Sequence, residues 1–127
     1  MTQEDKELLF KDLCARLPYG VKVKTNNINI LKLGSHTRVG EYVTDVIEPC
    51  KPYLFPLSSM TEEQYNEFFS YYHNIEMDAV KASGDYLKAA YIGDDAKYSW
   101  LNKNHIDYRG LIEKSLALDA TNLGIYE

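Results

Sequence analysis

Residues 48–64 read EPCKPYLFPLSSMTEEQ, and different kinds of structure are expected on the two sides of this stretch. Each proline fixes φ and removes a backbone donor, so its first part cannot be a helix interior or a central strand and should be extended. The prolines are Pro49, Pro52 and Pro56. The sequence therefore predicts a proline-rich connector over residues 49–60, which could lie along the edge of a sheet.

The second part of the stretch holds two overlapping helix-start signals. Ser59 precedes Glu62 by three residues, and Thr61 precedes Gln64 by three. Both pairs fit a capping box, in which the hydroxyl and the later side chain satisfy each other's free backbone donors. We therefore expect a helix to begin near residue 61.

The part before the connector is expected to hold one helix and a small antiparallel sheet. Apolar residues recur at helical spacing over residues 3–17, with Thr2 as a cap and Pro18-Tyr19-Gly20 as a stop. Residues 21–25 and 28–33 read as strands joined by a two-residue turn at Asn26-Asn27. A third strand is expected over residues 39–47, which alternate in polarity.

The part after the connector is expected to be helical. An aromatic stripe at helical spacing predicts a helix over residues 61–73. Residues 75–93 fit a helix or a strand, and we favour a helix. Further helices are expected after Asp94 or Asp95 and after Asp107. The stripe consists of Tyr65, Phe68, Phe69 and Tyr72, and the last helix would carry Leu111, Ile112, Leu116 and Leu118.

These expectations combine into one α+β domain over residues 1–127, because no flexible linker or internal repeat separates the halves. An N-terminal helix and a β-meander would occupy residues 1–48. The connector would follow over residues 49–60, and a helical half over residues 61–120 would pack on the sheet. The tail over residues 121–127 is expected to fray.

Composition limits the classes of function. The net charge is −5, and residues 61–127 hold six Lys or Arg against twelve Asp or Glu. An acidic half disfavours nucleic acid as a partner, because phosphate binding depends on Lys and Arg. No apolar run is long enough for a membrane span, and the acidic amino terminus is unlike a signal peptide, so we expect a cytoplasmic protein. Cys14 and Cys50 are expected to be free thiols.

His105-Ile106-Asp107 is the most enzyme-like fragment, because an aspartate can orient an imidazole. We favour the simpler interpretation in which Asp107 caps a helix and His105 is a partly buried polar residue, since no nucleophile accompanies them. No metal-ligand spacing and no glycine-rich phosphate loop is present. The sequence therefore predicts no metal and no cofactor.

Lysines around the expected hairpin are the best candidates for a nucleic-acid surface. Lys22 and Lys24 share a strand face, and Lys32 and Arg38 follow. Cations also protect an edge strand from pairing with other chains, and we favour that explanation.

Three segments resemble a group of small uncharacterised proteins encoded by anaerobic gut bacteria, often in phage-like or mobile regions. The segments are LLFKDLCARLPYGV at residues 8–21, KPYLFPLSSMTEE at residues 51–63, and WLN at residues 100–102 with HIDYRGLIEK at residues 105–114. The resemblance implies a phage or mobile-element origin and a cytoplasmic setting. It supplies no catalytic residue.

The leading hypothesis from the sequence is a small non-enzymatic α+β module that binds another protein. Eight of the eleven tyrosines lie between Tyr53 and Tyr108, and tyrosine is enriched in binding surfaces. The first alternative is an enzyme or metal site at His105 and Asp107, and the second is weak nucleic-acid binding through the Lys22/Lys24 hairpin. The expected binding face consists of Tyr53, Phe55, Tyr71, Tyr72 and Tyr108.

Overall fold

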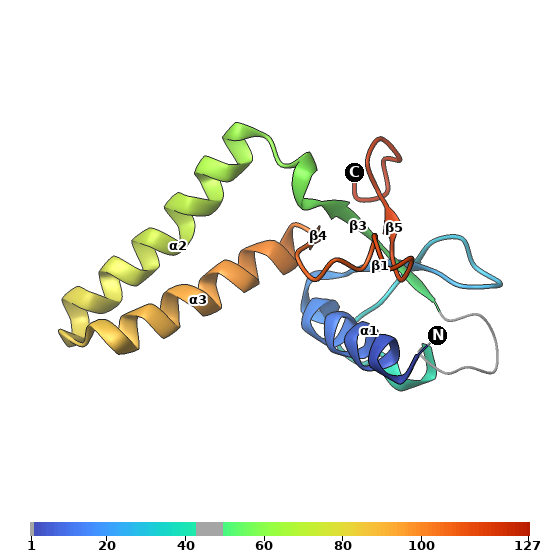
Figure 1. The fold of residues 1–127 in the computed structure, drawn as a ribbon, viewed down its shortest axis with the longest axis horizontal. Helices are drawn as coiled ribbons and strands as arrows, with labels where there is room; N and C mark the ends of the chain where they lie inside the picture. The colour runs from blue at the N-terminus through green and yellow to red at the C-terminus, as the bar shows by residue number, and fades with distance from the viewer. Residues whose placement is uncertain (1, 43–49) are drawn as a thin grey trace. The chain divides into compact units, whose positions relative to one another are not determined.

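The computed structural model describes residues 2–42 and 50–127 (Figure 1). Two compact units are present. We call them the sheet unit, which comprises the described part of Met1–Leu57 together with His105–Glu127, and the hairpin unit, Ser58–Asn104. A helix, a small sheet and two further helices confirm the predicted α+β class. The expectation of a single domain stays a prediction.

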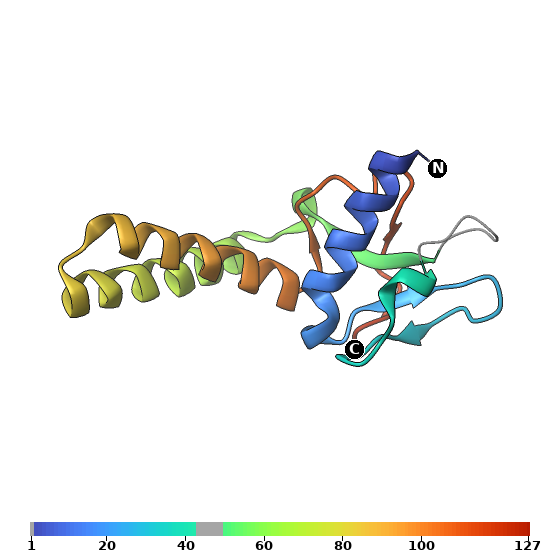
Figure 2. The ribbon, with the colours of Figure 1, turned by 90° about the horizontal axis from the view of Figure 1, so that it is seen from below.

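The sheet unit begins with α1 (Gln3–Arg16), whose start follows the predicted signal. The Thr2 hydroxyl accepts a hydrogen bond from the Asp5 amide, and the Asp5 side chain accepts one from the Thr2 amide. The helix lies across one face of the sheet (Figure 2). Its buried residues Leu9 and Leu13 enter a core that includes Val23 and Leu54 from the strands. Burial of this apolar stripe fixes the helix on the sheet.

The sheet is mixed, which corrects the prediction of an antiparallel one. The strands are β1 (Lys22–Lys24), β2 (Leu31–Lys32), β3 (Lys51–Pro56), β4 (Ile106–Asp107) and β5 (Leu118–Asp119). Strands β1 and β2 pair antiparallel, as do β1 and β3, but β4 and β5 each run parallel to β3. The two parallel strands lie in the last part of the chain, where the sequence predicted a helix after Asp107.

The segment predicted as an edge connector is the central strand, because β3 pairs with β1, β4 and β5. Its prolines are tolerated because each neighbour pairs with only two residues of β3. The Phe55 amide donates to the His105 carbonyl, while the Leu54 carbonyl accepts from the Ala120 amide. Pro52 and Pro56 lie at positions where a missing donor leaves these bonds intact.

The predicted hairpin is present with a shifted register. The Thr25 amide donates to the Ile28 carbonyl around the Asn26-Asn27 turn, as expected for a two-residue connection. The strands pair Lys22 with Lys32, however, and this register includes one residue more than that turn alone allows. The extra residue is the signature of a bulge. It directs Leu31 and Leu33 toward the core and leaves Ile28 and Ile30 exposed.

The predicted third strand is wrong where it can be compared. Val39–Tyr42 form a short 3-10 helix, and Val39 is buried in the core. Residues 43–47 of that prediction lie outside the described residues.

The hairpin unit consists of α2 (Glu62–Ser83) and α3 (Tyr86–Lys103), which run side by side (Figures 1 and 2). Thr61 and Gln64 form the predicted capping box, and Gly84 ends α2 with a φ of 67°. The helix favoured for residues 75–93 is confirmed. The predicted start at Asp94 or Asp95 is wrong, because Asp85 caps α3 and both aspartates lie in its interior.

The segment after Asp107 is not the predicted last helix. Turns carry it to β5, and Gly110 and Ser115 have φ values of 74° and 60°, which a helix does not contain. Leu111 and Leu116 are nonetheless buried in the core of the sheet unit, and turn hydrogen bonds hold the segment between them, including one from the Leu116 amide to the Leu111 carbonyl.

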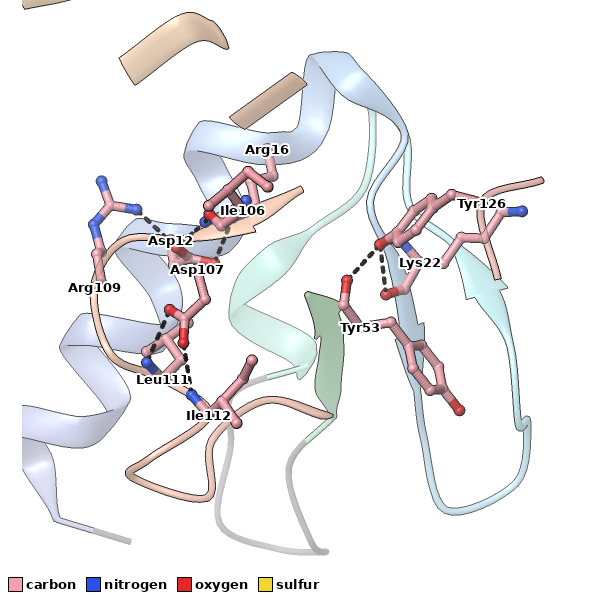
Figure 3. Close-up of polar contacts among 10 residues, drawn as sticks. All are labelled: Asp12, Arg16, Lys22, Tyr53, Ile106, Asp107, Arg109, Leu111, Ile112 and Tyr126. Carbon is pink, nitrogen blue, oxygen red and sulfur yellow. Dashed lines mark hydrogen bonds and ion pairs between the residues drawn. The ribbon is translucent and has the colours of Figure 1, made fainter. Parts of the chain in front are cut away.

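The tail is anchored at Tyr126, in contrast to the predicted fraying. Extension of the β1–β3 register places Lys22 opposite Tyr53. The Tyr126 hydroxyl lies between these two residues: it accepts from the Lys22 amide at 2.9 Å and donates to the Tyr53 carbonyl at 2.7 Å (Figure 3). The hydroxyl thus takes the place of a strand-to-strand hydrogen bond.

Candidate functional site

A buried ionic cluster lies beside the His105-Ile106-Asp107 segment (Figure 3). Asp12 and Arg16 are one helical turn apart on α1, and both side chains are 0% exposed. The Asp12 carboxylate accepts from Arg16 Nε at 2.9 Å and from Arg109 Nη1 at 2.9 Å. Arg16 Nη2 also donates to the Ile106 carbonyl at 2.7 Å. The cluster therefore joins α1 to β4 and to the turn that follows.

Two guanidinium groups share one carboxylate in this cluster. Tyr108 supplies further stabilisation, because its ring centroid lies 5.4 Å from the Arg16 guanidinium carbon and 4.7 Å from that of Arg109. Such contacts are attractive because the ring face is electron-rich. Arg16 Nη1 is buried and has no hydrogen-bond partner among the described residues.

Asp107 uses both carboxylate oxygens on the backbone. Oδ1 accepts from the Leu111 amide at 3.0 Å and Oδ2 from the Ile112 amide at 2.9 Å (Figure 3). A carboxylate that accepts two backbone donors holds a turn in place, as a helix cap does. The predicted capping role is thus present, although the segment that it caps is a turn.

The His105 side chain packs against the C-terminal tail, residues 121–127. Its ring stacks on that of Tyr126, with centroids 3.7 Å apart and planes within 10°. Burial, together with the nearby positive charges of Arg16 and Lys22, lowers the pKa of His105 from 6.5 to about 4. Its Nδ1 is buried without a hydrogen-bond partner among the described residues. An imidazole with this pKa is neutral and a weak base at neutral pH.

The lowered pKa predicts that the sheet unit loses stability as the pH falls from about 6.5 toward 4. The unfolded chain binds a proton at His105 in this window and the folded chain does not, so acid favours unfolding. By pH 5 the wild type should have lost about 2 kcal/mol of unfolding free energy relative to a His105→Phe variant.

Urea unfolding at a series of pH values, followed by far-ultraviolet circular dichroism, measures this difference. The phenylalanine ring keeps the stack on Tyr126 and cannot titrate. Titration of the carboxyl groups changes the unfolding free energy of both proteins equally, so it cancels in the comparison. Parallel pH curves for the two proteins would contradict the predicted burial of a neutral imidazole.

The five predicted binding residues are divided between the two units. Tyr53 is 7% exposed and its hydroxyl donates to the Asn29 carbonyl, while Phe55 and Tyr108 are half-buried in the same unit. Tyr71 and Tyr72 belong to the hairpin unit, where Tyr71 is exposed and Tyr72 is half-buried under the Lys97 ammonium.

The two sides of α3 differ: one side is buried against α2, and the other is an exposed apolar surface that the sequence did not predict. Ala89, Gly93, Ala96 and Trp100 recur every three to four residues and are buried. Phe68 on α2 packs against the Trp100 ring at 5.2 Å, and a side chain at Gly93 would meet Glu76 of α2. The small residues therefore let the two helices approach closely.

The opposite side of α3 carries Leu87, Tyr91 and Tyr98, which are 67%, 66% and 53% exposed. We call these three residues the α3 stripe. On α2, no residue is fully buried, and Tyr65, Phe69, Tyr71 and Met77 are exposed. The spacing of the α3 stripe would have been visible in the sequence if the helix had been placed from residue 86. The ambiguity of residues 75–93 concealed it.

No cluster of three or more His, Cys, Asp or Glu side chains that could hold a metal ion occurs among residues 2–42 and 50–127. Within the same residues, every helix is too short or too polar to cross a membrane.

Comparison of the chain with protein-family models, with curated proteins and with solved structures gave no match. The candidate sites are therefore judged on their own geometry.

Proposed function

We propose that the chain is a small non-enzymatic module that binds another protein through the exposed apolar side chains of its helical hairpin. The observation that supports this most is α2, which extends over 22 residues without one buried residue. A helix of a globular protein normally buries an apolar face about 100° wide. Here α2 has no buried residue, and Ala89, Gly93, Ala96 and Trp100 of α3 are buried on the side that faces α2.

The α3 stripe extends the exposed surface. Large apolar side chains that recur on one helix face are typical of a binding surface, because single exposed ones occur by chance but rows of them are rare. Tyrosine suits such a surface because its ring gives apolar contact area and its hydroxyl can stay hydrated until a partner arrives.

Charge indicates the kind of partner. The hairpin unit holds four Lys and eight Asp or Glu, which gives a net charge of −4. A complementary partner would carry an apolar groove bordered by Lys or Arg, because opposite charges at the rim steer association and reject acidic surfaces. The resemblance supports the further proposal that the chain is an accessory protein of a phage or mobile element, with a cytoplasmic setting.

Affinity capture with a surface variant tests the proposal. The variant Leu87→Ser/Tyr91→Ser/Tyr98→Ser removes the α3 stripe. The control Phe10→Ser/Ile28→Ser/Ile30→Ser removes three exposed apolar side chains from the sheet unit. We expect a partner from the host cells to be captured by the wild type and the control, and to fall at least about tenfold for the stripe variant.

Circular dichroism decides whether the stripe is surface or core. The stripe variant should keep the helical signal and unfold near the wild-type temperature, since exposed side chains contribute little to stability. Equal capture by all three proteins would refute the proposed surface. Loss of helical structure in the stripe variant would show that these residues are needed for folding instead.

A further inference from the structure

The strand register places four lysines on one face of the sheet. Lys22 and Lys24 alternate along β1 and therefore share a face. Lys22 pairs with Lys32 of β2, and Lys24 pairs with Lys51 of β3, and directly paired residues point to the same side. We call these four residues the lysine face. Val23 points to the opposite side, into the core beneath α1.

Protection of a sheet edge does not explain this arrangement. Edge protection requires cations on an outer strand, but β1 lies between β2 and β3. Like charges directly opposite each other in neighbouring strands destabilise a sheet, and the lysine face contains two such pairs. Four positive charges are thus concentrated where they oppose folding, which is typical of a surface that binds an anion.

The surroundings of the lysine face leave its charges accessible. Lys24 and Lys32 are exposed, and Lys22 and Lys51 are half-buried. None of the four forms an ion pair with a described residue. The Lys22 ammonium donates to the Ile125 carbonyl at 2.6 Å and has two further donors.

The charge of the sheet unit is unevenly distributed. Helix α1, which covers the other face, holds four acidic residues against three basic ones: Glu4, Asp5, Glu7 and Asp12 against Lys6, Lys11 and Arg16. The unit as a whole holds ten Lys or Arg and nine Asp or Glu among its described residues, so its net charge is close to zero. The lysine face is therefore a local feature and does not reflect a generally basic chain.

We infer that the lysine face binds the phosphate backbone of single-stranded nucleic acid. The lysines follow one another across three strands, from Lys32 on β2 through β1 to Lys51 on β3. Neighbouring strands lie about 4.8 Å apart and alternate residues about 6.6 Å apart, so the charges form a narrow patch for a few successive phosphates of one strand. Phe55 alternates with Lys51 along β3 and is half-buried, so its ring lies on the same side of the sheet as the lysine face, where it can contact a base.

The lysine face uses different residues from the surface proposed for protein binding, because none of its lysines belongs to the hairpin unit, Ser58–Asn104. It also revises the expectation that nucleic acid is an unfavoured partner, which rested on the acidity of residues 61–127. Those acidic residues belong mainly to the hairpin unit, whose net charge is −4, and not to the lysine face.

Fluorescence anisotropy with a labelled oligothymidylate and a labelled oligouridylate of about 12 nucleotides tests the inference on the full chain. Four neutralised phosphates predict that the dissociation constant rises about 50-fold between about 50 and 200 mM salt. The variant Lys24→Glu/Lys51→Glu should weaken binding at least about tenfold at the lower salt concentration. The control Lys11→Glu/Lys114→Glu makes the same change of net charge with exposed residues off the lysine face, and should bind like the wild type.

A milder variant, Lys24→Gln/Lys32→Gln, keeps the test valid if charge reversal prevents folding. It should weaken binding and flatten the salt dependence. Absence of salt-dependent binding, or equal weakening by the control, would overturn the inference. So would tighter binding to a duplex of the same length, or binding only to vesicles that contain phosphatidylserine, because each would assign the lysine face to a different ligand.

Discussion

Replacement of Asp12 by alanine should destabilise the sheet unit by about 3 to 5 kcal/mol, because Arg16 would be left buried without its counter-ion. The Arg16 side chain is 0% exposed, so water cannot replace the lost carboxylate without a change of structure. Arg109 would lose the same partner, although its side chain is 17% exposed and can be hydrated in part.

Hydrogen exchange of the β1 and β3 amides measures the stability of the sheet unit, in which Asp12 lies. Trp100 fluorescence follows the hairpin unit and should change less. The double variant Asp12→Leu/Arg16→Met should recover much of the loss, because an apolar pair needs no counter-ion. Glu4→Ala, at an exposed acidic position of the same helix, is the matched control. An Asp12→Ala protein as stable as Glu4→Ala would contradict the buried cluster.

Replacement of Asp107 by alanine should cost about 2 to 4 kcal/mol, because the amides of Leu111 and Ile112 would lose a charged acceptor at a mostly buried site. Asp107→Asn should cost less, since one amide oxygen can still accept a hydrogen bond. The order of stability should therefore be aspartate, asparagine, alanine.

Urea unfolding of the three proteins gives this order, and it separates the capping role from the enzyme hypothesis. A cap predicts that stability changes while the protonation of His105 does not, because both Asp107 oxygens are already used on the backbone. If both variants kept wild-type stability and instead changed the pH titration of His105 followed by nuclear magnetic resonance, an aspartate–histidine pair would be the better interpretation.

Local signals in the sequence were sufficient for the starts of α1 and α2 and for the end of α1. The Thr2 and Thr61 capping boxes and the Pro18-Tyr19-Gly20 stop each depend on residues within four positions of one another. Their geometry is decided by the chain nearby, so a pattern of hydroxyl, acidic or amide residues and glycine identifies them. The α+β class follows from these signals together with the alternating hairpin.

The centre of the sheet could not be predicted in the same way. Pro52 and Pro56 favour an edge, and only the distant segments at Ile106 and Leu118 show that β3 is central. These partners are strands of two residues each, too short for an alternating pattern to be detected. The apolar spacing at Leu111 and Leu116 matched a helix although the segment forms turns.

The candidate sites show the same division between local and distant information. Asp107 was recognised as a cap because the backbone amides that donate to its carboxylate lie four and five residues away. The contact of Tyr126 with Lys22 and Tyr53 joins residues far apart in the chain, and no local pattern indicates it. Prediction of the lysine face would have required the register of β1, β2 and β3. The predicted two-residue turn gave a register for β1 and β2 that is shifted by one residue.

The central proposal is a protein-binding surface on the hairpin unit. Site-specific photo-cross-linking from position 91 tests it most directly. A photoreactive phenylalanine analogue would replace Tyr91 in cells that carry the gene, and a matched sample would carry it at the exposed Phe10 of the sheet unit. The proposal predicts a discrete protein adduct from position 91 that is absent from position 10. Adducts of equal yield from both positions, or from position 10 alone, would contradict it.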